Sequence, residues 1–134
     1  MFNDLLRKIL NTRDDTGRFS LADIQKNRLM ALLSYLWLGW LVPMFAAKDS
    51  PYALYHSRQG MLLCIAETLL VLVLRILGYI PILGILFRIA RVLVIIVAVL
   101  LSLLGIYNCY QGRARELPGM NLLMDLLSRV AGKR

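Results

Sequence analysis

Two short polar stretches, residues 49–60 and 112–119, hold most of the side chains in this sequence that could do chemistry. They bring together an imidazole, an amide, a carboxylate and several guanidinium groups, which are the groups that bind phosphate headgroups or peptides. The alternative is that they cap and lock the ends of neighbouring helices, as charged residues at helix ends usually do. The candidate binding-surface residues are His56, Arg58, Gln59, Arg113, Arg115 and Glu116.

No catalytic set accompanies these groups in the sequence. There is one histidine, and we find neither a glycine-rich phosphate loop nor a nucleophile with a base at a recognisable spacing. The two cysteines, Cys64 and Cys109, lie inside apolar stretches and form no CxxC metal motif. We therefore expect a protein that is not an enzyme and that carries no cofactor and no metal.

The composition excludes an ordinary soluble domain. Hydrophobic residues make up 59% of the 134 residues and charged residues 18%, whereas soluble domains are about 45–50% apolar. The net charge of +8 suits contact with anionic lipid headgroups. Nucleic acid is the weaker explanation, because the basic residues are spread over span ends and tails without interleaved aromatic residues. The sequence therefore predicts an integral membrane protein whose partners include membrane lipids.

Three apolar stretches are long enough to cross a membrane, at about 29–47, 60–77 and 85–110. Pro43 should kink the first stretch, and Ser20 is a candidate N-cap for the helix that leads into it. The predicted fold class is all-α: a polytopic helical membrane protein with about three transmembrane helices. Residues 20–112 form the transmembrane domain, 1–19 an amphipathic N-terminal helix and linker, and 113–134 a C-terminal amphipathic tail.

The terminal helices are predicted from apolar stripes at helical spacing. The N-terminal stripe packs either on lipid or on protein, this chain or a second copy, and the C-terminal stripe suggests an interfacial helix. With three spans, the two polar stretches share one membrane face and the N-terminus lies on the other. A small excess of Lys and Arg on the N-terminal side favours a cytoplasmic N-terminus. The stripes are Phe2, Leu5, Leu6, Ile9 and Leu10, and then Met120, Leu123, Leu127 and Val130.

Four charged residues interrupt the second and third spans, and each needs a partner or a route to water. Arg75 and Arg88 fall at shallow depth on the two arms of a hairpin, where they can reach lipid headgroups. Glu67 and Arg91 are offset by about four residues, or roughly 6 Å, which an arginine can bridge. We therefore expect an intramembrane ion pair, Glu67–Arg91. The sharper interpretation is a proton or ion pathway.

Several motifs resemble a known family in consistent order from Ser20 to Leu127. They are Asp23–Tyr35, Val42–Pro51, the Tyr-His-Ser-Arg-Gln-Gly run at 55–60 and Gly112–Pro118. These resemble an uncharacterised family of small bacterial membrane proteins related to the chloroplast inner-envelope protein-import component, the Tic-twenty-like superfamily. Its bacterial members usually show Phe-His-Ala-Asn-Gln-Gly, so Arg58 is a departure. The resemblance implies membrane location and a helical hairpin core, but it does not transfer protein import.

Two functions follow as expectations. The first is a non-enzymatic protein of the bacterial cytoplasmic membrane that self-associates or binds a partner membrane protein, with the His56 and Glu116 face as the recognition surface. The second is a small oligomeric channel or carrier that uses Glu67 and Arg91. Three helices enclose little by themselves, which favours a homo-oligomer or a partner in both cases.

Overall fold

The computed structural model describes residues 1–10, 13–130 and 132, and its regular elements are all helical. Its isolated β-bridge pairs Asp14 with Arg115. An all-α fold was predicted, and it is confirmed for these residues. The α-helices are α1 Phe2–Leu10, α2 Leu21–Leu33, α3 Leu41–Ala46, α4 Pro51–Leu77, α5 Gly84–Tyr110 and α6 Met120–Val130, with short 3-10 helices at Thr16–Arg18 and Trp37–Trp40.

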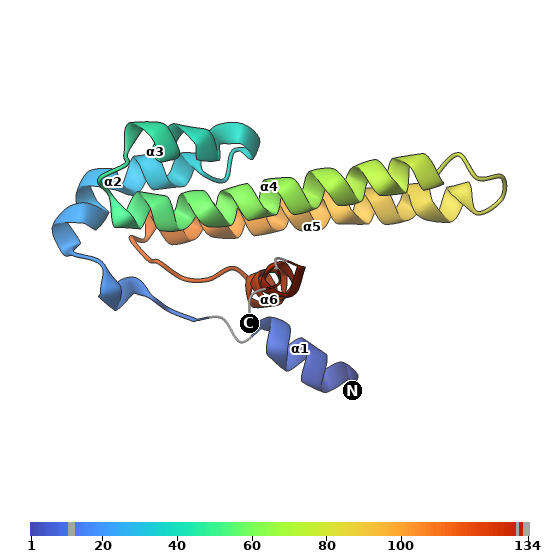
Figure 1. The fold of residues 1–134 in the computed structure, drawn as a ribbon, viewed down its shortest axis with the longest axis horizontal. Helices are drawn as coiled ribbons and strands as arrows, with labels where there is room; N and C mark the ends of the chain where they lie inside the picture. Colours follow the sequence, from blue (N-terminus) through green and yellow to red (C-terminus); the bar gives the residue numbers. More distant parts are fainter. Residues whose placement is uncertain (11–12, 131, 133–134) are drawn as a thin grey trace.

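Helices α4 and α5 form a long antiparallel hairpin (Figure 1). Each has 27 residues, or about 40 Å at 1.5 Å per residue, and both are long and apolar enough to cross a membrane. Helix α4 begins nine residues before the predicted span because Ser50 caps it. The Ser50 hydroxyl accepts from the Ala53 N–H at 3.1 Å, and Pro51 occupies the first helical turn, where a missing N–H costs nothing.

The predicted first span, 29–47, is not a single helix. Helix α2 ends at Leu33, the chain turns, and the segment from Trp37 to Ala46 runs back beside α2 (Figure 1). Trp37 lies in the turn at φ +50, which bulky residues rarely adopt. Gly39 permits the reversal, because a Cβ there would overlap the Leu33 carbonyl oxygen. Hydropathy alone predicted a span because it does not register this turn.

The bent segment changes the topology that was predicted. The N-terminal linker and the loop after α5 lie together: the Asp15 N–H donates to the Ala114 carbonyl at 2.8 Å, and the Glu116 N–H donates to the Arg13 carbonyl at 2.9 Å. A three-span arrangement had put them on opposite faces. We call this region, where both polar stretches and the linker meet, the terminal end, and residues 78–83 the tip.

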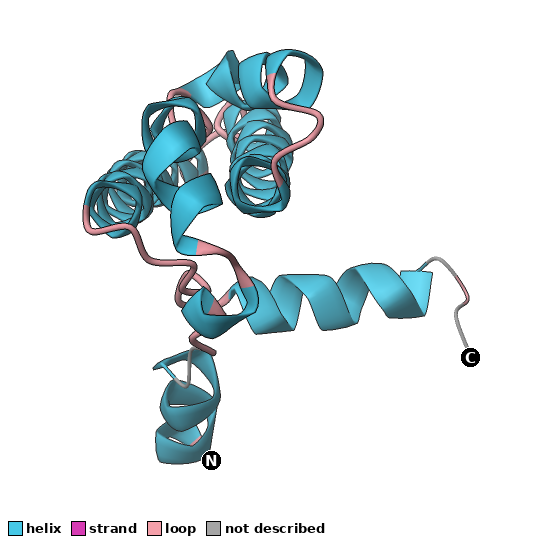
Figure 2. Ribbon diagram, turned by 90° about the vertical axis from the view of Figure 1, so that its left-hand side faces the viewer, coloured by secondary structure: helices cyan, strands magenta, loops and turns pink. Residues whose placement is uncertain are grey.

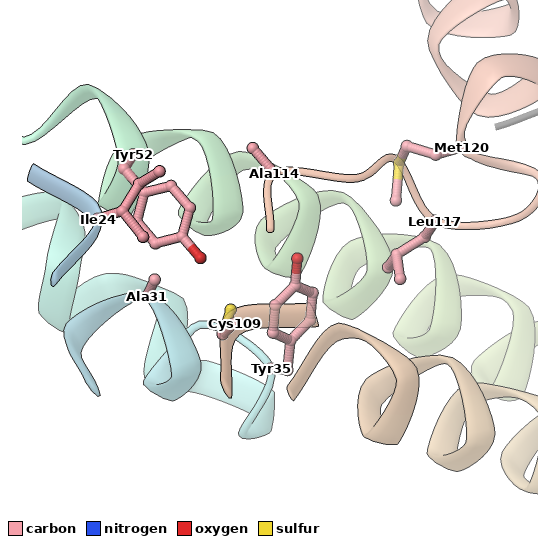
Figure 3. Close-up of a cluster of buried hydrophobic side chains, with 8 residues drawn as sticks. All are labelled: Ile24, Ala31, Tyr35, Tyr52, Cys109, Ala114, Leu117 and Met120. Carbon is pink, nitrogen blue, oxygen red and sulfur yellow. The ribbon is translucent and has the colours of Figure 1, made fainter. Parts of the chain in front are cut away.

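The buried core lies at the terminal end, between α2, α4 and α5 (Figure 3). Its members are Ile24, Ala31, Tyr35, Tyr52, Cys109, Ala114, Leu117 and Met120. Away from this core the hairpin faces outward: 17% of the most apolar stretch of α4 and 11% of that of α5 are buried within the chain. Soluble proteins rarely expose so large an apolar surface.

Helices α1 and α6 contact each other beside the hairpin. The Gly119 N–H donates to the Ile9 carbonyl at 3.1 Å, and the Asn121 side chain donates to the Lys8 carbonyl at 2.8 Å. Helix α6 is seen end-on in Figure 1 and along its length in Figure 2, where the hairpin is end-on, so it lies across the hairpin and not along it. Both helices keep exposed apolar side chains, among them Phe2 and Val130.

Candidate functional site

His56 lies at the centre of the terminal end and is completely buried. Its Nε2 is 2.8 Å from the Arg113 carbonyl oxygen, and its Nδ1 is 2.6 Å from the Tyr35 hydroxyl. Because a carbonyl only accepts, Nε2 carries the proton and Nδ1 accepts from Tyr35. Burial raises the pKa of Tyr35 well above its usual value, so its hydroxyl remains a donor. His56 is therefore a neutral bridge between two helices and a loop.

Three tyrosine rings surround this imidazole edge to face. Ring centroids of Tyr35, Tyr52 and Tyr55 lie 5.6, 4.9 and 5.3 Å from that of His56. The Tyr52 hydroxyl also donates to the Arg113 carbonyl, at 3.1 Å. Aromatic pairs of this geometry contribute about 0.5–1.5 kcal/mol each beyond area burial. The sequence had predicted His56 as a surface residue, whereas the structure encloses it.

Gln59, one turn beyond His56, holds the same loop. Its side-chain oxygen accepts from the Leu117 N–H at 3.1 Å, and both residues are buried. Together His56 and Gln59 fix the loop across α4 at two points, Arg113 and Leu117. The two polar stretches meet as predicted, and the contacts described here join side chains of α4 to backbone atoms of the loop.

The charged candidates point outward. Arg58, Arg113 and Arg115 are exposed, and Glu116 is half-buried. The Arg113 side chain contributes nothing to the contacts with His56 and Tyr52, which use its carbonyl oxygen. The inward-facing and outward-facing members of the predicted set thus have different roles, because the former position the loop and the latter form its surface.

Asp23 is a further residue of this site that was not singled out for it. Its carboxylate accepts from the Ser50 hydroxyl, the Tyr52 N–H at 3.0 Å and the Asn27 amide at 2.9 Å. Burial raises its pKa, but these hydrogen bonds lower it more, so the pKa is below its usual value. The N-cap that was predicted at Ser20 is confirmed, with the Asp23 N–H donating to it at 3.1 Å.

Asp15 forms a second anchor between the linker and α4. It is buried, accepts from the Tyr55 hydroxyl at 3.3 Å and forms salt bridges with Arg13 and Arg18 at 3.0 and 3.7 Å. The Thr16 hydroxyl accepts from the Ala114 N–H at 3.0 Å. Only a linker was predicted here, since nothing local in the sequence marks a contact with a loop nearly 100 residues away.

Glu67 and Arg91 are not paired in this structure. Among the described residues, no salt bridge joins them. Glu67 lines cavities together with Ala98, which is seven residues beyond Arg91 on α5, or about 10 Å along the helix. Arg75 and Arg88 are exposed near the tip.

The buried side chains of this site act as a hydrogen-bonded lock. Within the described part of the chain, no three His, Cys, Asp or Glu residues lie close enough together to hold a metal ion. The ring nitrogens of His56 are both engaged, so it is not poised to take a proton from a substrate. What the arrangement does is fix the surface that carries Arg58, Arg115 and Glu116.

Comparison with known sequences identifies the family. No curated protein and no solved structure matches this chain. Residues 26–123 match the sequence model of the MamF/MmsF family, described as the magnetosome magnetite crystal formation protein family. This match overturns the assignment to the Tic-twenty-like superfamily, whose motifs were read from short stretches within the same region. Because the match spans both hairpin helices and both polar stretches, this chain belongs to the magnetosome magnetite crystal formation protein family, MamF/MmsF.

Proposed function

We propose that this chain is an integral protein of the magnetosome membrane that supports magnetite crystal formation without catalysis, by associating with copies of itself or with a partner membrane protein. The observation that carries the proposal is the family match over residues 26–123. It is supported by the outward apolar surface of α4 and α5, which needs lipid or protein around it.

The locked loop supplies the recognition surface in this proposal. His56 and Gln59 hold residues 113–117 in place, so Arg58, Arg115 and Glu116 are presented on a fixed backbone. A preordered surface loses less conformational entropy on binding than a mobile loop does. The buried residues are therefore positioning residues, and the exposed ones make the contacts.

Charge supports one orientation of the hairpin. Of the 16 Lys and Arg residues, all but Arg75, Arg88 and Arg91 lie at the terminal end or in the terminal segments. Positive residues beside spans concentrate on the cytoplasmic side. We therefore propose that both termini are cytoplasmic and that the tip faces the compartment across the membrane. The sequence analysis also predicted a cytoplasmic N-terminus. The present proposal differs in placing two spans after it instead of three.

Complementation in a magnetite-forming bacterium tests the function. A strain that lacks this gene would receive the wild type, Arg58→Ala/Arg115→Ala, or Ile82→Ala as a matched control at the tip. We expect smaller or fewer crystals by electron microscopy with the double variant, at equal membrane abundance, and normal crystals with the control. Normal crystals in the strain that lacks the gene would overturn the proposal.

A second candidate is a small oligomeric channel or carrier, favoured by one observation. Glu67 lies half-buried between α4 and α5 beside two cavities, and it forms no salt bridge with the described residues. An unpaired carboxyl at this depth costs about 2.5 kcal/mol or more unless water or another chain reaches it. Glu67→Gln should then change ion flux in liposomes while leaving assembly intact. Unchanged flux would exclude this function.

A further inference from the structure

A cavity of about 420 Å³ lies at the terminal end, beside the first three turns of α4. Its walls come from five segments: the N-terminal linker, the loop before α4, the first three turns of α4, the loop after α5 and the start of α6. His56 is fully buried and does not line it. Two of its lining residues, Arg58 and Glu116, also belong to the recognition surface proposed above.

The rim of the cavity is basic. Four cationic side chains line it: Arg13, Arg18, Lys48 and Arg58. Arg13 and Arg18 share the Asp15 carboxylate, so one of their two charges stays uncompensated. Lys48 and Arg58 are exposed and form no salt bridge with the described residues. Two carboxylates, Asp49 and Glu116, also lie on the rim, so a net positive charge remains.

The floor of the cavity is apolar and continues along the hairpin. Leu54 and Leu62 line it from α4, while Met120 and Met124 line it from α6. Helix α6 lies across the hairpin at this level, as an amphipathic helix does when it rests in the plane of the headgroup region (Figures 1 and 2). With α4 and α5 inserted as proposed above, the cavity would join cationic and apolar side chains near the level where headgroups meet acyl chains.

We propose that this cavity binds an anionic membrane phospholipid, with its phosphate between Lys48 and Arg58 and an acyl chain along Leu62 and Met124. The inference rests on the proposed membrane insertion of α4 and α5. Guanidinium and ammonium groups bind phosphate oxygens through charge-assisted hydrogen bonds, and unpaired cations at this depth gain most from doing so. A free phosphate offers the same charge but leaves the apolar floor empty.

Native mass spectrometry of the full-length protein tests this site. The protein would be released from nanodiscs containing equal phosphatidylglycerol and phosphatidylcholine. We expect the wild type to retain phosphatidylglycerol preferentially. Lys48→Gln/Arg58→Gln should reduce that retention by about tenfold or more. Arg7→Gln/Lys8→Gln removes the same charge from exposed positions outside the cavity and should retain the lipid as the wild type does. Equal loss in both double variants would overturn the proposal.

Two further experiments distinguish a phospholipid site from a site for free phosphate. Met124→Glu places a carboxylate on the apolar floor and should also release the lipid, whereas inorganic phosphate added alone should not displace it. Displacement by phosphate alone would identify an anion site and overturn the lipid assignment. Carbonate extraction reports membrane insertion separately: a chain that is extracted refutes the proposed function, whereas an inserted chain with no phosphatidylglycerol preference refutes the lipid site only.

Discussion

The two ends of the α4–α5 hairpin differ in what holds them in place. At the terminal end, buried His56, Gln59 and Asp15 cross-link the linker, α4 and the loop after α5. At the tip, Tyr79, Ile82 and their neighbours are exposed and apolar, and packing on other elements is sparse. One end is therefore ordered by hydrogen bonds within the chain, while the other depends on what surrounds it.

The largest loss of stability should come from His56→Ala, at the terminal end. This change leaves a cavity and removes the bonds to Tyr35 and the Arg113 carbonyl, which should cost about 3 kcal/mol or more of unfolding free energy. Thermal unfolding in a mild detergent measures it. Arg58→Ala, an exposed position two residues along the same helix, should change stability by about 0.5 kcal/mol at most. Equal effects would mean that the terminal end is not locked through this imidazole.

The next largest loss of stability should come from Gly60→Ala. A Cβ at Gly60 would overlap the Ser34 carbonyl oxygen, so α2 would have to move away from α4. We expect a loss of about 1–3 kcal/mol, as for other overpacked sites. Gly78→Ala, at the tip, brings a Cβ no closer than 3.2 Å to other atoms and should cost less. A larger effect at Gly78 would reverse the comparison.

Acid should weaken the terminal end selectively through Asp23. Its pKa is below its usual value in the folded chain, so its stabilisation is present above the unfolded pKa and is lost as the pH falls through the folded one. Unfolding curves between about pH 5 and pH 3 should therefore show a decline that Asp23→Ala reduces. At neutral pH this variant should be less stable by about 1 kcal/mol, as for lost helix caps. Parallel declines in both proteins would exclude Asp23 as the cause.

The smallest effect should come from the tip itself. Ile82 adopts φ +69, a left-handed conformation that costs a β-branched residue about 1 kcal/mol or more. Ile82→Asn should relieve part of that strain and raise stability by about 0.5 kcal/mol, which chemical denaturation can detect. A loss of stability would show that the Ile82 side chain makes contacts that matter more than its backbone.

The same division explains what could be predicted from sequence. Local signals were sufficient for the Ser20 N-cap and for the helix over the apolar stretch 85–110, which is observed at 84–110. They failed at 29–47, because hydropathy does not register the turn at Trp37 or the close approach of Gly39 to the Leu33 carbonyl. Asp15 and Asp23 were missed as anchors, since their partners lie on other elements and carry no spacing signal.

The family assignment shows a related limit. Short motifs such as the run at 55–60 suggested the Tic-twenty-like superfamily. The match along residues 26–123 identified the MamF/MmsF family instead. His56 and Gln59, which lie in one of those motifs, hold a loop in place. A recurring motif does not tell whether its residues hold the structure or bind a ligand. The direction in which a side chain points, and not its residue type, separates residues that hold the loop from residues that form its surface.

The composition of the tip bears on how the chain enters a membrane during synthesis. Residues 78–83 contain no ionisable group other than the Tyr79 phenol, and the loop between α4 and α5 is six residues long. With the orientation proposed above, no hydrophilic domain has to be translocated, and the hairpin can insert as one unit. Biogenesis of this protein then requires little beyond the partitioning of two apolar helices into lipid.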